Sequence, residues 1–316
     1  MSQHILVTGG AGFIGSHLTE RLLELGYRVT VIDNFDPFYS RASKESNIHA
    51  VMTHPSFRLV ELDIRDGKRM EEELTENYSA VIHLAAKAGV RPSIADPLGY
   101  EDVNVKGTMQ LLEFARIKGI KQFIFGSSSS VYGVNPMLPW KEDEVQLLPI
   151  SPYAATKIAA ELIGHVYSRI YGIRFLALRF FTVFGPRQRP DLAIHSFSKK
   201  ILSNQPIQVF GDGTTRRDYT YVADIVAGIV AALHYNQSDF EIINLGNHQS
   251  VSLNELLTTL EEVLEKKLQL EHLPEQTGDV PATYADINKA QRLLNYHPHT
   301  GLKAGITAFR DWLLEK

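Results

Sequence analysis

Tyr153 and Lys157 stand four residues apart in a segment of helical pattern, Tyr-Ala-Ala-Thr-Lys. On an α-helix, residues at i and i+4 lie on the same face, so the phenol and the ammonium can interact. A tyrosine with an ordinary pKa of ~10 is a poor base at neutral pH, but nearby positive charge favours the phenolate. We therefore expect Tyr153 to remove the proton of a substrate hydroxyl, with Lys157 as its charge partner.

Four consecutive serines at 127–130 follow an apolar run at 123–125 that is typical of a buried strand. Ligands of open parallel α/β sheets bind beyond the carboxyl ends of the strands, so these hydroxyls are expected at a binding crevice. One of them could hold the reacting oxygen or relay its proton. A chance Tyr-x-x-x-Lys spacing on a helix surface, or a simple serine-rich turn, is the alternative interpretation at this point.

A glycine-rich turn near the start of the chain predicts a dinucleotide site. Residues 5–7 form an apolar run, residues 8–12 contain three glycines, and a helical pattern begins at Phe13. The amide groups and dipole of a helix start bind pyrophosphate, and glycines let the backbone approach it closely. Asp33 ends the next apolar run, near the ~20-residue offset at which an acid binds the adenosine ribose. A carboxylate there repels a 2′-phosphate, which favours NAD over NADP.

Short apolar runs alternate with longer helical patterns through the first half of the chain, as in βαβ units that build a parallel sheet. Several runs are continuously apolar, as expected for strands covered on both faces. The predicted strands are Ile5–Val7, Val29–Asp33, Phe57–Leu62, Ala80–Leu84, Gln122–Gly126 and Arg174–Phe180, and the predicted helices are Phe13–Leu25, Leu98–Lys118 and Pro152–Tyr171. We expect an α/β fold in which residues 1–185 form a doubly wound parallel sheet of Rossmann type that binds the dinucleotide.

Beyond residue 185 strand-like runs and helical patterns no longer alternate regularly. A loop rich in Pro and Arg at 186–191 is followed by a helical pattern that ends at Ser203, a short strand, a glycine-rich turn at 211–213 and several further helical patterns. These helical patterns lie near Val222–Tyr235, Leu253–Lys266 and Ala304–Leu314. We expect residues 186–316 to form a smaller mixed α/β lobe that binds substrate, with some elements crossing back into the main sheet and a ligand cleft between the lobes.

The composition of the 316-residue chain disfavours several classes of function. Its 32 Lys and Arg are outnumbered by 36 Asp and Glu, so the chain has no overall positive charge that would attract nucleic acid or an anionic membrane. The absence of Cys excludes cysteine nucleophiles and thiolate metal sites, and the 12 His show no His-x-x-x-His spacing, so no metal is expected. No run approaches the ~18 apolar residues of a membrane span, and a strand-like run from His4 leaves no room for a signal peptide. We expect a cytoplasmic protein that acts on a small molecule.

The motifs, taken in order, resemble those of the extended short-chain dehydrogenase/reductase family, the nucleotide-sugar epimerases and dehydratases, over nearly the whole length. The matching stretches are 8–15 (TGGAGFIG), 63–64 (DI), 83–86 (HLAA), 127–133 (SSSSVYG), 153–157 (YAATK) and 217–219 (RDY). The resemblance implies that Ser128, Tyr153 and Lys157 are catalytic. It also implies that NAD contacts Gly9, Gly12, Phe13, Ile14, Gly15, Asp33, Asn34, Asp63, Ile64, Leu84, Ala85, Ala86, Asn104, Tyr153 and Lys157. Family members are often homodimers through a four-helix bundle, which would use Leu98–Lys118 and Pro152–Tyr171 here.

Within this family the stretch 179–191 resembles the UDP-glucuronate 4-epimerases, in which Thr stands where galactose-type epimerases carry Asn. The related 4,6-dehydratases have an acidic pair after the catalytic hydroxyl, and the decarboxylases have a Glu near it, whereas Ser129 and Ser130 follow Ser128 here. This favours a reaction of hydride removal and return alone. The implied substrate contacts are Arg91, Ser129, Ser130, Thr182, Arg189, Arg217 and Asp279, with Arg187 as a close competitor of Arg189 and Gln276 in the place of a second phosphate-binding Arg.

The resemblance implies interconversion of UDP-glucuronate and UDP-galacturonate. Tyr153 would remove the C4 hydroxyl proton while the C4 hydride passes to NAD⁺, and the 4-keto sugar would rotate and take the hydride back on its other face. Because this intermediate is a β-keto acid that loses CO₂ readily, we expect Thr182 and Arg189 to fix the carboxylate. Two alternatives stay open: a UDP-glucose or UDP-N-acetylhexosamine 4-epimerase, and a non-catalytic NAD-binding scaffold.

Overall fold

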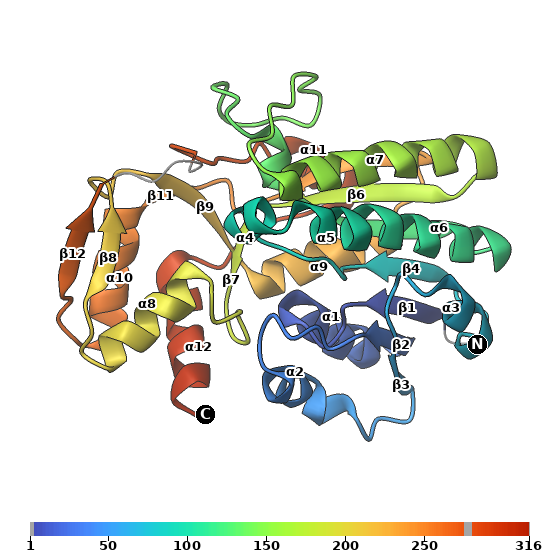
Figure 1. Cartoon of the computed structure of the whole chain (residues 1–316), viewed down its shortest axis with the longest axis horizontal. Coiled ribbons are helices and arrows are strands. Elements are labelled where there is room, and N and C mark those ends of the chain that lie inside the picture. The colour runs from blue at the N-terminus through green and yellow to red at the C-terminus, as the bar shows by residue number, and fades with distance from the viewer. Residues whose placement is uncertain (1–2, 275–279, 316) are drawn as a thin grey trace.

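Seven parallel strands form the central sheet of the computed structural model, which describes residues 3–274 and 280–315 (Figure 1). Its strands are β1 (His4–Thr8), β2 (Arg28–Asp33), β3 (Phe57–Glu61), β4 (Ala80–His83), β5 (Gln122–Ser128), β6 (Arg174–Phe180) and β10 (Phe240–Leu245). The order across the sheet is β10-β6-β5-β4-β1-β2-β3. Both β2 and β4 pair with β1, so the chain changes direction across the sheet beside β1. Ligands of such sheets bind at this switch point.

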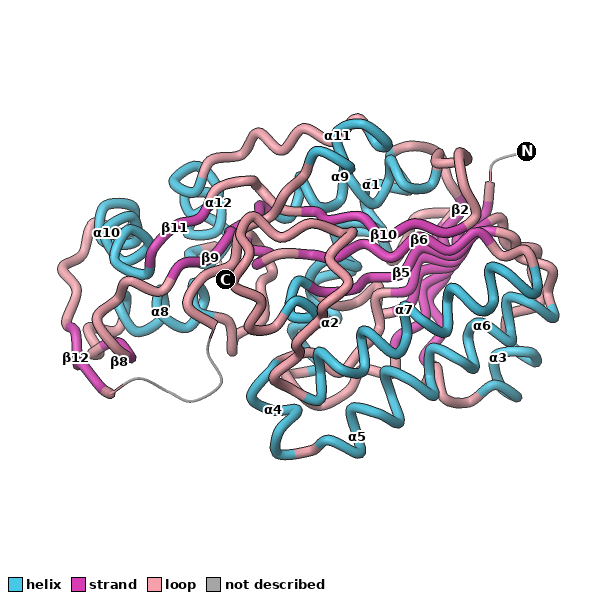
Figure 2. Tube along the Cα trace, turned by 90° about the horizontal axis from the view of Figure 1, so that it is seen from above, coloured by secondary structure: helices cyan, strands magenta, loops and turns pink. Residues whose placement is uncertain are grey.

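Helices cover both faces of this sheet (Figure 2). One face carries α3 (Gly67–Glu73), α6 (Gly107–Ile117) and α7 (Pro152–Tyr171), and the other carries α1 (Phe13–Glu24), α9 (Val222–Leu233) and α11 (Asn288–Leu294). Strand side chains alternate between two cores: Leu6 belongs to the α6/α7 side, and Val7 to the α1/α9 side. The predicted doubly wound fold is therefore confirmed.

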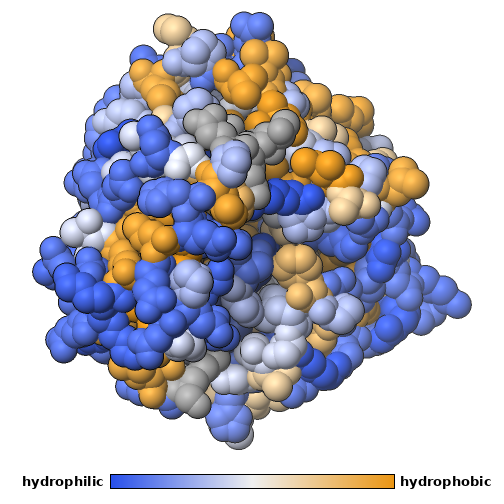
Figure 3. Space-filling view, turned by 60° about the vertical axis from the view of Figure 1, so that its left-hand side comes forward, coloured by the Kyte–Doolittle hydropathy of each residue, from blue (hydrophilic) through white to orange (hydrophobic). Residues whose placement is uncertain are grey.

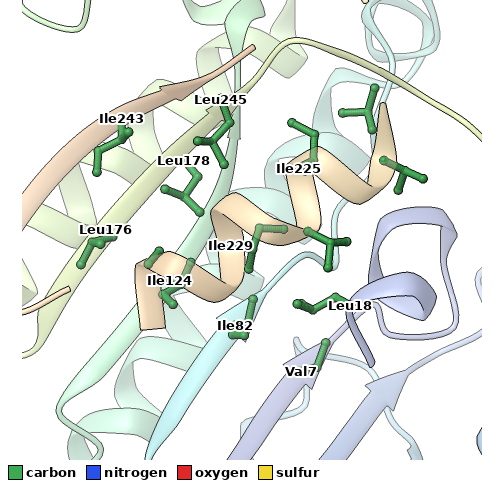
Figure 4. Packing of buried hydrophobic residues seen from close by; sticks show 14 of the residues in the cluster. Val7, Leu18, Ile82, Ile124, Leu176, Leu178, Ile225, Ile229, Ile243 and Leu245 are labelled. Carbon is green, nitrogen blue, oxygen red and sulfur yellow. The ribbon is translucent and has the colours of Figure 1, made fainter. Parts of the chain in front are cut away.

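The C-terminal half contributes directly to the main unit. Figure 4 shows Ile225 and Ile229 of α9 packed over Ile82, Ile124 and other side chains of the sheet. Strand β10 pairs along its whole length with β6 at the sheet edge. The main unit is thus built from both stretches of sequence, in line with the crossing back expected for 186–316, and the division at residue 185 stays a proposal.

The remaining C-terminal elements form a smaller lobe, at the left of Figure 1. They are β7 (Thr182–Phe184), α8 (Ala193–Leu202), β8 (Ile207–Phe210), β9 (Arg216–Tyr221), β11 (Ser250–Ser252), α10 (Leu253–Leu264), β12 (Leu270–Leu273) and α12 (Leu302–Leu314). Two small sheets, β11-β9-β7 and β12-β8, pack with these helices around their own apolar core. The face of this lobe that Figure 3 shows is mostly hydrophilic, with separate hydrophobic patches.

The predicted helix Leu98–Lys118 is wrong as a single α-helix. The structure has α5 (Pro97–Glu101), a π-helical segment η2 (Asp102–Lys106) and then α6. A π turn widens the helix by one residue per turn and is frequent at functional sites. The sequence pattern of apolar residues cannot distinguish it from an α turn, because only the hydrogen-bond register differs.

Several short elements complete the chain: α2 (Arg41–Ile48), η1 (His49–Val51), α4 (Val90–Ala95) and η3 (Ser129–Tyr132). Helix α2 was not predicted from the sequence, although Ser40 caps it by accepting a hydrogen bond from the Ser43 amide at 3.2 Å. Among the helices of residues 3–274 and 280–315, none combines the length and apolar character needed to cross a lipid bilayer.

Candidate active site

Helix α7 begins where β5 and β6 end, and its start is set by local sequence. Ser151 is the N-cap and accepts a hydrogen bond from the Ala154 amide at 3.2 Å, while Pro152 occupies the first helical position. Gly172 ends the helix in the left-handed conformation, with φ of 63°. This fixed start places Tyr153 in the first turn of α7.

The structure brings Ser128, Tyr153 and Lys157 together. Ser128 ends β5 and hydrogen-bonds the Tyr153 side chain. The Lys157 Nζ lies 5.9 Å from the centre of the Tyr153 ring and donates to the Gly126 carbonyl at 2.7 Å. The Ser128 hydroxyl also accepts from the Ser130 hydroxyl at 2.9 Å, so Ser130 orients Ser128. A substrate hydroxyl beside Tyr153 would therefore meet two proton-carrying groups.

The electrostatics of this centre correct one expectation. Burial raises the pKa of Tyr153, while the hydrogen bond with Ser128 and the charge of Arg189 oppose that rise. Burial also lowers the pKa of Lys157 to about 7, and its amine is turned to the Gly126 carbonyl. Burial thus corrects the simple expectation that the Lys157 charge lowers the pKa of Tyr153, because desolvation of both side chains opposes that effect.

The glycine turn forms a cradle that side chains would fill. A Cβ on Gly15 would lie 2.2 Å from the Gly9 carbonyl oxygen, and one on Gly9 would lie 2.8 Å from the Ala85 nitrogen. Gly9 also has φ of 69°, which favours glycine. The amides of Leu84 and Ala85 donate to the Thr8 hydroxyl and hold this turn against the end of β4. Phe13 and Ile14 open α1 directly after Gly12, which has no side chain to cap the helix. The cradle therefore fits a pyrophosphate at the start of α1.

Asp33 lies beside this turn, at the carboxyl end of β2. Its carboxylate accepts from the Ala11 amide at 3.2 Å and the Phe35 amide at 2.9 Å. Lys44 of α2 forms a buried ion pair with it at 3.3 Å. Sequence reasoning missed Lys44, since the helix that carries it was not predicted. Asp33 thus anchors the glycine turn, and its contact with the adenosine ribose stays a prediction.

Three further residues predicted to contact the cofactor, Asn34, Asp63 and Ile64, lie at the edge of the same site. The Asn34 amide donates to Asp63 at 2.9 Å, and hydrogen bonds from Arg65 lower the pKa of Asp63 to about 2. Asp63 therefore stays ionised at neutral pH. Ile64 is buried against Gly107, where a Cβ would lie 2.7 Å from the Ile64 side chain. These contacts bring the end of β3 to the start of α6.

Asn104 connects the catalytic helix to the segment after β4. In the π segment η2, its side chain exchanges hydrogen bonds with the Lys87 backbone, both at 2.9 Å, and donates to the Thr156 hydroxyl at 3.1 Å. Ala86 immediately precedes this clamp. Asn104 is therefore placed to fix the relative position of the segment 84–87 and the helix that carries Tyr153.

Arg189 reaches the reacting centre, whereas Arg187 does not. The Arg189 guanidinium binds both oxygens of Asp191, at 3.0 and 2.7 Å, and its charge opposes the raised pKa of Tyr153. Arg187, in the left-handed conformation with φ of 64°, instead pairs with Glu20 of α1 at 2.7 Å. These opposite directions favour Arg189 over Arg187 as the substrate contact, which stays a prediction. Asp191 was missed as a partner of Arg189.

The other expected substrate contacts lie around the junction of the lobes. Thr182 begins β7 and is half-buried. The Arg217 guanidinium donates to the carbonyls of Arg216 and Val280, and the Arg91 guanidinium lies 5.7 Å from the centre of the Phe210 ring. Ser129 follows Ser128 at the start of η3. Asp279 and Gln276 lie outside the described residues.

Another aromatic side chain at the centre was not singled out from the sequence. The Tyr100 ring contacts that of Tyr153 edge to face, with centroids 6.2 Å apart, and its hydroxyl donates to the Ala88 carbonyl at 3.2 Å. Tyr100 is buried, and burial raises its pKa to about 12. It therefore supports the Tyr153 ring as a neutral group.

The sheet, the glycine cradle and the Ser–Tyr–Lys group together define a dinucleotide-dependent enzyme that moves protons at a substrate hydroxyl. The chain belongs to the NAD dependent epimerase/dehydratase family, whose model matches residues 5–246. A UDP-glucuronate 4-epimerase of Thermodesulfobacterium geofontis is 40% identical over 315 residues, which cover 99% of this chain and 96% of the relative.

Solved structures are similar over the same length. A UDP-glucuronic acid 4-epimerase from Bacillus cereus, in complex with UDP-glucuronic acid and NAD, has a TM-score of 0.92 at 38% identity and covers 99% of each chain. A UDP-glucose 4-epimerase from Thermotoga maritima, with UDP-glucose, has a TM-score of 0.91 at 32% identity, again over 99% of each chain. The fold and the class of enzyme are thus common to relatives that act on different sugars.

Proposed function

We propose that this protein is an NAD-dependent 4-epimerase that interconverts UDP-glucuronate and UDP-galacturonate. The observation that carries the choice of sugar is the place of the Arg189 guanidinium. It donates to the Ala88 carbonyl at 3.4 Å, the same carbonyl that binds Tyr100, whose ring contacts that of Tyr153. Its charge also opposes the raised pKa of Tyr153. A uronate presents a carboxylate, for which a guanidinium fork and hydroxyl donors are suitable partners. Thr182, Ser129 and Ser130 supply hydroxyls, and relatives of matching length carry this activity in their names.

Each residue of the centre has a role in this reaction. Tyr153 accepts the C4 hydroxyl proton, and Ser128 hydrogen-bonds the phenol. The ammonium of Lys157 favours the negative phenolate when it is protonated. NAD, when bound, supplies the hydride acceptor and the positive charge of its oxidised ring. After the 4-keto sugar has rotated to present its other face, the hydride returns to C4 and Tyr153 returns the proton to the C4 oxygen.

Arg189 has the further task of protecting the intermediate. A β-keto acid loses CO₂ when the bond to its carboxylate carbon lies perpendicular to the plane of the keto group, because the electrons of that bond can then pass into the carbonyl and form an enolate. Because Asp191 holds the Arg189 guanidinium through two hydrogen bonds, its direction is fixed before substrate binds. A fixed guanidinium can hold the carboxylate through the sugar's rotation.

Incubation with UDP-glucuronate and NAD⁺ tests the proposal. We expect UDP-galacturonate as the main product, identified by a chromatographic shift at unchanged mass and with no net formation of NADH. A UDP-pentose of lower mass would contradict the proposal, since it would identify a decarboxylase. Faster turnover of UDP-glucose or a UDP-N-acetylhexosamine would favour the alternative epimerases, and no turnover of any UDP-sugar would favour a scaffold.

We also propose that the protein is a homodimer through α5, α6 and α7. These helices lie side by side on one flank (Figure 2) and expose apolar side chains: Leu98, Met109, Ile117, Leu162, Val166 and Ile170. An exposed apolar stripe of this extent is typical of a protein–protein interface. A cytoplasmic location stays a prediction from the sequence.

Light scattering coupled to size exclusion tests the dimer. We expect about twice the mass of the 35.5 kDa chain, and we expect Leu162→Glu to give the monomer, because a charge in the apolar interface loses its water. The matched control is Leu314→Glu in α12, which is similarly exposed, 61% against 64%, and should leave the mass unchanged. A wild-type monomer would contradict the proposal.

A further inference from the structure

A buried ion pair lies directly behind the reacting centre. Glu161 of α7 and Arg179 of β6 join through two hydrogen bonds, at 3.0 and 2.7 Å, with side chains only 4% and 2% exposed. The Ser127 hydroxyl donates to the same carboxylate at 2.5 Å. Arg179 also stacks on the Tyr132 ring, with its guanidinium carbon 4.8 Å from the ring centre. The reaction described above uses none of these groups.

This pair meets the strand and the helix that carry the catalytic residues. Glu161 follows Lys157 by four residues on α7, so the two side chains lie on the same face of the helix. Ser127 precedes Ser128 on β5 and pairs with Arg179 across the sheet. Gly126, just before Ser127, provides the carbonyl that Lys157 binds. The Glu161 carboxylate therefore connects β5, which carries the catalytic serine, to α7, which carries the catalytic lysine.

A purely structural role explains such a pair poorly. Taking two charges out of water is costly, and well-packed apolar side chains of similar volume often stabilise a protein as much or more. Apolar side chains would also join α7 to β6. What they cannot supply is a negative charge next to a buried lysine, and the charge of Glu161 raises the pKa of Lys157 against the effect of burial.

We propose that Glu161 is a positioning residue that keeps Lys157 protonated and, through Ser127, holds the end of β5 in register with α7. The proposal deepens the function inferred above, on which its kinetic readout rests. Arg179 fixes the Glu161 carboxylate in place. Protonated Lys157 then favours the phenolate of Tyr153 when the substrate hydroxyl gives up its proton.

The charged and titratable groups around Lys157 are few. Tyr153 and Glu161 face it from α7, and Arg179 binds Glu161 from β6. From β4 comes His83, which is buried between Thr8 and Thr108, and burial with the charge of Lys157 lowers its pKa to about 3. His83 is therefore neutral at working pH. Strand β5 contributes the uncharged Phe125 ring and the Gly126 carbonyl. The negative charge that favours the ammonium comes from Glu161.

Glu161→Gln tests the proposal, since it keeps the shape and removes the charge. The first readout is the pKa of Lys157, measured by NMR of protein labelled with ¹³C-lysine, with the signal assigned by Lys157→Arg. We expect this pKa to fall by about one unit or more. The second readout is the pH profile of kcat with UDP-glucuronate, whose alkaline limb should move to lower pH by the same amount, because the ammonium is lost earlier as pH rises. Glu161→Asp, which keeps the charge, should restore both.

The control is Glu241→Gln on the edge strand β10, which removes a 2.6 Å ion pair with Lys289 of α11. It should leave the pKa of Lys157 unchanged. If Glu161→Gln does not fold because Arg179 is left unpaired, the double variant with Arg179→Met removes both charges. It should show a fall in the same direction but smaller, because the opposing positive charge is removed as well. An unchanged pKa of Lys157 in the folded variant would overturn the proposal. If UDP-glucuronate is not the substrate, NMR should still show the fall in the pKa of Lys157. Only the shift in the pH profile of kcat would then be missing.

Discussion

Tyr153→Phe is expected to lower kcat with UDP-glucuronate by about 10³-fold, within the range that a positioned general base contributes. The variant removes only the hydroxyl that accepts the substrate proton and that Ser128 hydrogen-bonds. The ring stays half-buried against Tyr100, so we expect little change in Tm or in NAD affinity. Steady-state kinetics, thermal unfolding and NAD titration check the three expectations.

Tyr100→Phe is the matched control for this experiment. It also removes one phenol hydroxyl, from the ring next to Tyr153, but that hydroxyl binds the Ala88 carbonyl and not Ser128. We expect kcat to fall by less than about tenfold, the equivalent of one ordinary hydrogen bond. Equal losses in the two variants would show that Tyr153 acts through packing, and the assignment of the base would be wrong.

Arg189→Ala should reduce kcat/KM for UDP-glucuronate by about 10²-fold more than for UDP-glucose. A guanidinium that binds a carboxylate through charge-assisted bonds contributes about 3 kcal/mol, and a neutral hexose gains none of this. Because the Arg189 charge also opposes the raised pKa of Tyr153, its loss should slow both substrates at low pH. The ratio of the two kcat/KM values, measured at one pH, therefore isolates the recognition of the carboxylate.

The same variant tests the protection of the intermediate. With the carboxylate released, we expect a measurable fraction of UDP-pentose among the products, detected by its lower mass. Arg187→Ala is the control: it removes the neighbouring arginine, whose side chain pairs with Glu20 of α1, and should leave the substrate ratio and the products unchanged. An equal effect on both substrates in Arg189→Ala would contradict a role in recognising the sugar's carboxylate.

Local sequence determined the helix and the strands that carry this site. The cap at Ser151, Pro152 at the first helical position and Gly172 at the end define α7, so the spacing of Tyr153 and Lys157 on one helical face followed directly. Continuously apolar runs predicted six of the seven strands of the main sheet within a few residues. Such features depend on interactions between residues close in sequence, where residue type and spacing suffice.

The tertiary structure decided how these elements act on one another. Arg187 and Arg189 stand only two residues apart in the sequence. Glu20, far away in the chain, binds Arg187, whereas the charge of Arg189 acts on Tyr153. The pKa of Lys157 likewise depends on its burial by the sheet and on the Glu161 carboxylate, which Arg179 of a separate strand holds. Desolvation and contacts of this kind arise only when distant segments pack together, and no local spacing encodes them.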